Sequence, residues 1–224
     1  MTAGNCLIPF IASSDGFDDP KIVASFMGFN FHVESLLVVF EVIYFSIRRY
    51  GIEYDEVFFL KENLTDWESL PPLNSVKCQS QLSAINNTLF AYGKMNEFVD
   101  DLAGLEMFSF ELKQWCSLPP LQYERIRGAF IALDGFLYVI GGSRSGSWSR
   151  IVEKYNYESN TWHILASLPF AVPHPKVHTS RGLLFVSAGP LDPLPEHDFL
   201  LLYRYNCDDD IWTTLNVRKI TSNV

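Results

Sequence analysis

The chain has 224 residues, of which 48% are hydrophobic and 15% aromatic, which is enough for a packed core and unlike a disordered segment. Its formal net charge of -9 argues against binding to nucleic acid or to an anionic membrane surface, because both need a basic footprint. The four cysteines lie far apart without a C-x-x-C spacing, which indicates free, mostly buried thiols in a reducing compartment.

No targeting or membrane-spanning segment is predicted. The N-terminus has no basic region before its short apolar run, so a secretory signal is not expected. The longest apolar stretch, LLVVFEVIYFSI at residues 36–47, contains Glu41 and is well short of the ~20 residues that span a bilayer. We interpret this stretch as buried β structure and expect a cytoplasmic protein without membrane contact.

In chain order, residues 1–32 form an N-terminal segment with short β-like runs and a GFDDP turn, interpreted as the remnant of a further repeat. Repeats then occupy residues 33–224, with approximate boundaries at 33–73, 78–121, 125–170 and 176–216. Each repeat begins with two apolar runs around a pair of residues, a pattern typical of a β-hairpin with a two-residue loop. The expected turn pairs are Val39-Phe40, Asn86-Asn87, Asp134-Gly135 and Arg181-Gly182.

The second half of each repeat carries a large apolar residue and, seven positions later, a tryptophan. The four tryptophans are separated by 48, 47 and 50 residues and lie in related text: DWESLPPL, QWCSLPPL, TWHILASLP and IWTTLNV. A polar turn separates the two positions in every copy. Each repeat therefore predicts four short strands in about 48 residues, the size of one propeller blade. The paired positions are Leu60 and Trp67, Phe108 and Trp115, Tyr155 and Trp162, and Tyr205 and Trp212.

This pattern resembles the kelch repeat family. Residues 125–168 carry the whole family pattern, in which Gly141-Gly142 closes the second strand, Tyr155 lies in the third and Trp162 opens the fourth. The glycine pair is degenerate in the other copies, which have Ser46-Ile47, Gly93-Lys94 and Ala188-Gly189. The resemblance implies an all-β, kelch-type β-propeller of about four degenerate four-stranded blades. We interpret it as a partial propeller from a longer kelch protein, and the alternative is a divergent four-bladed ring.

The glycines and aromatic residues of this motif are predicted to be structural, with no cofactor role. Glycine permits positive φ and leaves no Cβ where the ring of one blade packs against the backbone of its neighbour. The predicted structural positions are Trp67, Gly93, Phe108, Trp115, Gly141, Gly142, Tyr155, Trp162, Gly189, Tyr205 and Trp212.

One face of such a propeller carries the loops between the second and third strands and the loops between blades, and loops on a rigid scaffold carry function. On this face the sequence places four arginines, a tryptophan outside the repeat register and a lysine: Arg125, Arg127, Arg144, Arg150, Trp148 and Lys176. Trp and Arg are enriched at interface hot spots, and several arginines suit an acidic or phosphorylated peptide.

Within this basic patch Arg125 is the strongest candidate, because kelch substrate adaptors often place a pocket-lining arginine at the start of a first strand. Acidic residues are expected on either side of the patch, in the second and fourth repeats: Glu97, Asp100, Asp101, Glu106, Asp192, Glu196 and Asp198.

No catalytic, cofactor or metal site is predicted. His174 and His178 lie four apart, but the intervening Pro175 prevents the shared helix face of a zinc helix. The chain is therefore interpreted as a non-enzymatic protein–protein interaction module. The kelch resemblance implies substrate recognition for a cullin-based ubiquitin ligase or binding to the actin cytoskeleton. The alternative is a carbohydrate-active kelch-type enzyme, either a sugar isomerase or an oxidase with Tyr, His and Cys copper ligands. The strand edges of a partial propeller would also allow self-association.

Overall fold

The computed structural model describes residues 31–39, 42–49, 56–60, 67–76, 78–94, 103–172, 174–188 and 201–216, which contain strands and turns. The strands form four four-stranded antiparallel sheets and one short hairpin, and each sheet is a meander of strands consecutive in the chain apart from that hairpin. We call the sheets blades 1 to 4 in chain order. Within these ranges no helix is long and apolar enough to cross a membrane.

The strand bounds follow the repeats. Blade 1 comprises β1 (Phe31–Val39), β2 (Val42–Arg49), β3 (Glu56–Leu60) and β4 (Trp67–Ser69). Blade 2 comprises β5 (Cys78–Ile85), β6 (Thr88–Lys94), β7 (Ala103–Ser109) and β8 (Gln114–Ser117). Blade 3 comprises β9 (Ala129–Leu133), β10 (Phe136–Ile140), β13 (Val152–Asn156) and β14 (Thr161–Leu165), with the inserted hairpin of β11 (Ser143–Arg144) and β12 (Ser147–Trp148). Blade 4 comprises β15 (Lys176–Ser180), β16 (Leu183–Ala188), β17 (Leu201–Asn206) and β18 (Ile211–Asn216).

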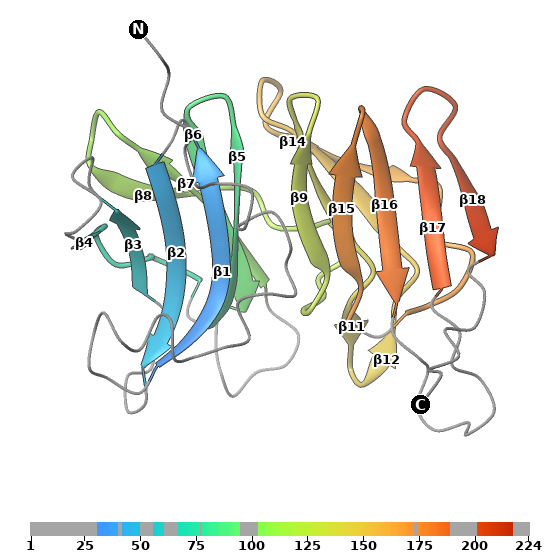
Figure 1. The fold of residues 1–224 in the computed structure, drawn as a ribbon, viewed down its shortest axis with the longest axis horizontal. Coiled ribbons are helices and arrows are strands. Elements are labelled where there is room, and N and C mark those ends of the chain that lie inside the picture. The colour runs from blue at the N-terminus through green and yellow to red at the C-terminus, as the bar shows by residue number, and fades with distance from the viewer. Residues whose placement is uncertain are drawn as a thin grey trace, which may run out of the picture.

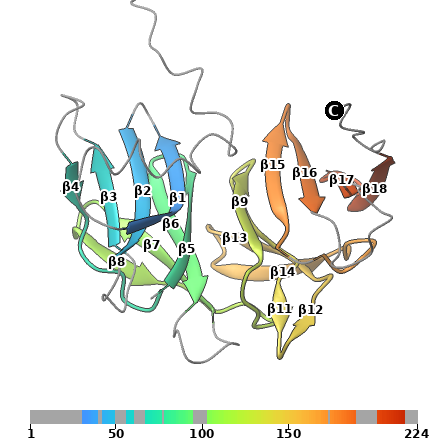
Figure 2. The same ribbon diagram turned by 60° about the horizontal axis from the view of Figure 1, so that its bottom comes forward.

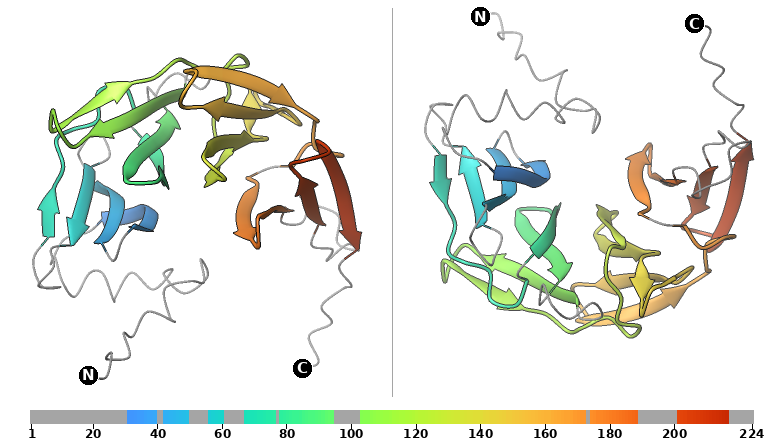
Figure 3. Two further views of the ribbon diagram at one scale, coloured as in Figure 1. Left: turned by 90° about the horizontal axis from the view of Figure 1, so that it is seen from above. Right: turned by 90° about the horizontal axis from the view of Figure 1, so that it is seen from below.

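The four blades follow one another around an arc. Figure 1 shows blades 1 and 2 beside blades 3 and 4, and the end-on views of Figure 3 show the arc from both ends. The first strand of each blade (β1, β5, β9 and β15) lies on the inner side of the arc, and consecutive inner strands contact one another (Figure 2). This arrangement confirms the predicted all-β partial propeller.

Three of the predicted hairpin turns lie where the sequence places them. Strand pairing extends to the residues on either side of each two-residue loop. The first loop residue has φ of 51, 49 or 53°, as the type I′ and II′ turns of two-residue hairpins both require. These loops are Asn86-Asn87, Asp134-Gly135 and Arg181-Gly182.

The turn of blade 1 was predicted one residue too early. Val39 belongs to β1 and pairs with Val42 of β2, so the two-residue connection begins at Phe40. The prediction of a Val39-Phe40 turn is therefore wrong by one position. Such a slip is easily made from sequence alone where both strands are continuously apolar, because no polar alternation marks the register. Phe40 itself lies outside the described residues.

The residues seven positions apart in each repeat are direct cross-strand partners. In blades 2, 3 and 4 the paired rings lie 5.2, 5.1 and 4.8 Å apart between centroids, a favourable distance for aromatic pairs. The polar turn between the third and fourth strands therefore brings a fixed sequence spacing into contact. The partners are Leu60 and Trp67, Phe108 and Trp115, Tyr155 and Trp162, and Tyr205 and Trp212.

The tryptophans of blades 2, 3 and 4 also tie each blade to the one before it. Each indole Nε1 donates to the carbonyl oxygen four residues after the preceding tryptophan position, at 2.9, 2.9 and 2.8 Å. The acceptors are Pro71, Pro119 and Ala166. The apolar core also lies between blades, with one cluster at each contact, which we call joints 1–2, 2–3 and 3–4. Blades are therefore held together mainly by their faces.

The glycine pair at the end of β10 has positive φ as predicted, but its close contacts differ from those expected. Gly141 and Gly142 have φ of 62 and 102°. A Cβ on Gly142 would lie 2.5 Å from the carbonyl oxygen of Ile126 and 2.8 Å from the nitrogen of Gly128, both in the segment that leads into β9 of the same blade. A Cβ on Gly141 would lie 3.2 Å from Cγ of Pro175. Gly142 thus lets β10 pass its own blade's lead-in segment, and the ring that Gly141 approaches is that of Pro175 and not an aromatic ring of the motif.

Other predicted positions are distributed as follows. Gly93 is buried in β6 opposite Gly104, whereas Gly189 lies outside the described residues. Cys116 and Cys207 are free and half-buried, so they are thiols as predicted but less buried than expected.

Candidate functional site

Arg125, predicted as the strongest partner contact, is buried, with 1% of its side chain exposed. Its guanidinium donates to the carbonyl oxygens of Gly141 and Val139 at 2.7 and 2.8 Å. It also forms an ion pair with Glu153, which is fully buried. These donors are directed at internal acceptors, so the prediction of an exposed contact is wrong. Arg125 holds the lead-in segment of blade 3 against the rest of its own blade.

Glu153 and its counterpart in blade 2, Glu106, each bind the backbone of the loop arriving from the preceding blade. Glu153 accepts the N–H groups of Gln122 and Tyr123 at 2.8 and 3.2 Å. Glu106 accepts three consecutive N–H groups at 2.7, 2.6 and 2.6 Å, those of Asn74, Ser75 and Val76. Since Glu106 is fully buried, its prediction as part of an acidic surface is wrong. The other predicted acidic residues lie outside the described residues: Glu97, Asp100, Asp101, Asp192, Glu196 and Asp198.

Three predicted contacts lie on or beside the β11–β12 hairpin. Arg144 is exposed, and Trp148 is 40% exposed with its ring edge-on to His174 at 5.3 Å between centroids. Arg150 Nε donates to the carbonyl oxygen of Leu168 at 2.6 Å. The hairpin and Arg150 therefore contact the loop between blades 3 and 4. Trp148 packs against His174, a partner that the sequence did not suggest.

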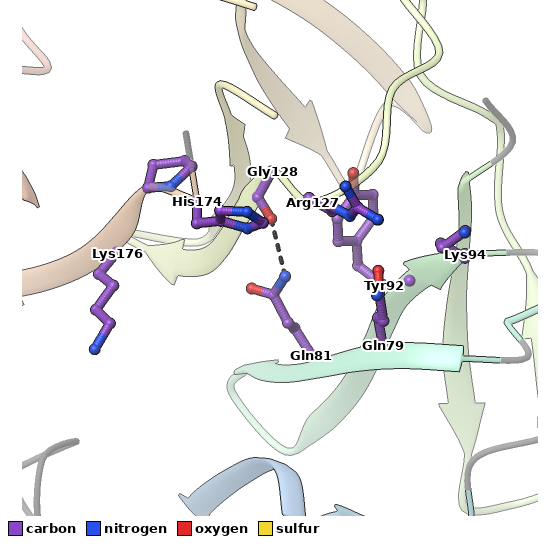
Figure 4. Close-up of a pocket in the computed structure, with 10 residues that line it drawn as sticks. Gln79, Gln81, Tyr92, Lys94, Arg127, Gly128, His174 and Lys176 are labelled. Atoms are coloured by element: carbon purple, nitrogen blue, oxygen red, sulfur yellow. Dashed lines mark hydrogen bonds between the residues drawn. The ribbon is translucent and has the colours of Figure 1, made fainter. Parts of the chain in front are cut away.

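A hollow of about 330 Å³ lies where blades 2, 3 and 4 meet, at the end of the blades that carries the loops between them (Figure 4). Ten residues line it: Gln79, Gln81, Tyr92, Gly93, Lys94, Arg127, Gly128, His174, Pro175 and Lys176. Four of these ten are Lys, Arg or His, and none is Asp or Glu. Of the predicted basic patch, Arg127 and Lys176 line the hollow, whereas Arg144, Trp148 and Arg150 lie outside its lining.

Three lining residues occupy the same position in successive blades. Gln79, Arg127 and His174 are separated by 48 and 47 residues and have φ of 54, 58 and 46°. This conformation costs a non-glycine residue roughly 1–2 kcal/mol, and such strained residues cluster at ligand sites. The Oε1 of Gln79 is buried and has no hydrogen-bond partner among the described residues. Sequence reasoning missed Gln79 and considered His174 only as a metal ligand, because a backbone angle cannot be read from residue type there.

Hydrogen bonds between blades hold the walls of the hollow. Gln81 Nε2 donates to the carbonyl oxygen of Gly128 at 2.9 Å, and Gln81 Oε1 accepts the N–H of Phe130 at 3.1 Å (Figure 4 shows the first). The hydroxyl of Tyr92 donates to the carbonyl oxygen of Arg125 at 3.0 Å. Burial raises the pKa of Tyr92 to about 12, so this phenol remains a hydrogen-bond donor at neutral pH. The walls are thus fixed before any ligand arrives.

The copper-oxidase alternative requires tyrosine and cysteine as metal ligands. Tyr138 and Cys207 approach each other across joint 3–4, with 3.9 Å from the hydroxyl oxygen to Sγ. Burial raises the pKa of both groups, which favours the protonated forms over the phenolate and thiolate that bind metals. In the part of the chain that the structure describes, no group of three or more His, Cys, Asp or Glu side chains could hold a metal ion.

The fold and the hollow define a class of protein, a β-propeller whose inter-blade loops surround a polar hollow. A family model described as the kelch motif matches residues 125–169. Kelch-like protein 35 of Mus musculus is 32% identical over 124 residues, which cover 55% of this chain and 21% of that protein. Kelch-like protein 38 of Homo sapiens is 23% identical over 171 residues, which cover 74% of this chain and 29% of that protein.

Kelch-like protein 36 of Rattus norvegicus is 24% identical over 113 residues, which cover 47% of this chain and 18% of that protein. The chain thus contains a kelch motif and is similar to kelch-like proteins. It spans between 18% and 29% of the length of these three relatives. The matches support a protein-interaction module of the kelch type.

Proposed function

We propose that this chain is a non-enzymatic interaction module whose hollow binds an acidic or phosphorylated segment of a partner protein. The observation that carries the proposal is the repeated left-handed position, which brings Arg127 and His174 from successive blades to one hollow. Lys94 and Lys176 add two further cationic groups. In a chain of net charge -9, a lining without a carboxylate is suited to an anionic group.

Exposed aromatic rings on the same loops support the proposal. Tyr123 lies in the loop between blades 2 and 3 and is 45% exposed, and Phe170 lies in the loop between blades 3 and 4 and is 61% exposed. Trp148 supplies a third ring beside His174. Aromatic residues around a charged centre are typical of interface hot spots, where they exclude water from the polar contacts.

The cellular role that we propose is based on the resemblance to kelch proteins. We propose that the acidic segment belongs to a substrate recognised for a cullin-based ubiquitin ligase in the cytoplasm, with the ligase recruited by another part of the assembly. A single hollow suits substrate recognition because it can bind a short extended segment and does not need a folded partner surface.

The test uses a fluorescein-labelled peptide, Ser-Val-Thr-Val-Thr-Val-Asp-Glu-Glu, and its neutral counterpart ending in Asn-Gln-Gln. We expect saturable binding of the acidic peptide by fluorescence anisotropy, weakened by added salt because charge contacts are screened. Arg127→Gln should weaken binding about tenfold, the loss of one charge-assisted hydrogen bond. Arg144→Gln, an exposed arginine outside the hollow, is the matched control and should bind as the unmodified chain does. Equal binding of both peptides, or an unchanged Arg127→Gln variant, would overturn the proposal.

A further inference from the structure

The inner strand of every blade has a free edge, because only its other edge pairs with the second strand. Hydrogen bonding alternates along an antiparallel pair, and the residues that flank a two-residue loop are bonded to each other. Every second N–H of the inner strand therefore points away from its sheet. The register assigns this orientation to Phe130 and Ala132 in β9, and to Val177 and Thr179 in β15.

In blade 3 these outward N–H groups are bound by side chains of blade 2. The N–H of Phe130 donates to Oε1 of Gln81 at 3.1 Å, and the N–H of Ala132 donates to Oγ of Ser83 at 2.8 Å. Two polar side chains thus take the place of a missing neighbouring strand. They close an edge that would otherwise be open to pairing with another chain.

Blade 4 does not receive this protection. The residues of blade 3 that correspond to Gln81 and Ser83, 48 positions later, are Ala129 and Ile131, which pack into the apolar core of joint 3–4. In the described part of the chain, no side chain or loop forms a hydrogen bond with the backbone of Val177 or Thr179. Along β15 every residue except Val177 is exposed. The edge of β15 therefore has backbone N–H groups without a protein partner among the described residues, on an accessible strand.

We propose that the edge of β15 binds an extended segment of the partner as an additional β-strand, continuing into the hollow. This inference rests on the proposed function, since it states along which strand the same acidic segment binds. Lys176 is both the first residue of β15 and part of the lining of the hollow. A strand that runs antiparallel to β15 would direct its C-terminal end to that lining, where acidic residues would meet Arg127 and His174.

The charge and position of β15 support this course. Lys176 and His178 are exposed on one face of the strand, so basic groups accompany the open edge over its first three residues. Figure 3 shows β15 on the inner side of the arc, beyond β9. Backbone pairing supplies affinity in such complexes, and the side chains supply specificity.

The experiment removes one outward N–H without touching the β15–β16 ladder. Thr179→Pro should weaken binding of the acidic peptide about tenfold, because proline at an outward-facing edge position deletes a donor and is otherwise tolerated. Thr179→Ala keeps the N–H and is the matched control, with binding unchanged. On peptide addition to the unmodified chain, amide exchange followed by NMR should slow at Val177 and Thr179 and stay unchanged at Phe130 and Ala132.

The outcomes separate this inference from the proposed function. If Arg127→Gln weakens binding while Thr179→Pro does not, and the Val177 and Thr179 amides are not protected, the hollow is the site and strand addition is wrong. If Thr179→Pro weakens binding while Arg127→Gln does not, strand addition stands and the hollow is not the anchor. An acidic peptide without saturable binding overturns both. Should Thr179→Pro fail to fold, the amide protection in the unmodified chain decides.

Discussion

Joints 2–3 and 3–4 share the indole hydrogen bond and an apolar core, but they differ in the polar groups beneath the connecting loop. At joint 2–3, Glu153 accepts two N–H groups of the arriving loop and Gln122 Nε2 donates to the carbonyl oxygen of Trp162 at 2.6 Å. We call this glutamate and amide the polar clamp. At joint 3–4 the corresponding residues are Tyr203, whose buried hydroxyl has no hydrogen-bond partner among the described residues, and Pro169, whose side chain has no donor.

Joint 1–2 shows that the two parts of the polar clamp occur together. There Glu106 accepts the N–H groups of the loop, and Asn74 Nδ2 donates to the carbonyl oxygen of Trp115. Among the described residues joint 3–4 lacks both parts, and there Asp210 accepts the N–H of Ala166 at 2.8 Å in addition to the indole bond of Trp212. Ring stacking and the indole bond are therefore common to the joints, and the clamp is an addition that fixes the loop.

Loss of the buried Glu153 carboxylate should lower the free energy of unfolding more than any other change considered. A small loss would remove the difference in polar stabilisation between joints 2–3 and 3–4. Glu153→Gln leaves the buried Arg125 guanidinium without its counter-charge, so we expect the free energy of unfolding to fall by about 3–5 kcal/mol. Urea denaturation measures this change. The double variant Arg125→Met with Glu153→Leu is the control and should recover much of the loss, because it removes both charges. A loss of less than about 1 kcal/mol in the single variant would mean that the clamp does not stabilise joint 2–3.

The glycine pair offers the next largest effect, because Gly142 touches the lead-in segment that the polar clamp of joint 2–3 also positions. Gly142→Ala should lower the free energy of unfolding by about 2–4 kcal/mol, from positive φ and a backbone clash together. Gly146 is the matched control, since its φ is 77° and an added Cβ meets nothing within 4 Å. Gly146→Ala should cost about 1 kcal/mol. Thermal melts of the two variants measure the difference, and equal losses would show that the close approach is not limiting.

The sequence predicted the blades well and the site poorly, for physical reasons. The tryptophan spacing and the turn pairs predict how consecutive strands pair within a blade. This pairing depends on residues close together in the sequence. The role of Arg125 depends on Glu153, 28 residues away, and the hollow is assembled from three blades. One signal was present in the sequence: Glu106 and Glu153 both lie two positions before a buried ring, on the buried face of the third strand. A carboxylate there is expected to have partners.

The pH dependence of the free energy of unfolding should show how tightly joint 2–3 holds the buried phenol of Tyr92. Its pKa is about 12 in the folded chain and about 10 when unfolded. Below pH 10 both states are protonated and the stability is complete. Between about pH 10 and 12 the unfolded state releases its proton first, so the free energy of unfolding falls as pH rises. Tyr92→Phe should reduce this alkaline loss by about 3 kcal/mol, measured by urea unfolding at several pH values. An identical alkaline profile would mean that the phenol is not held at the joint.

The smallest expected effect concerns Tyr203, which stands at the clamp glutamate's position in blade 4. Its hydroxyl is buried and has no hydrogen-bond partner among the described residues, so Tyr203→Phe should leave stability unchanged or raise it by up to about 1 kcal/mol. Tyr205→Phe is the matched control, because the Tyr205 hydroxyl donates to Asp210 Oδ1 at 2.6 Å and its loss should cost about 1 kcal/mol. Thermal melts compare the two. Equal losses would place a polar partner at Tyr203, and joint 3–4 would then have a clamp of its own.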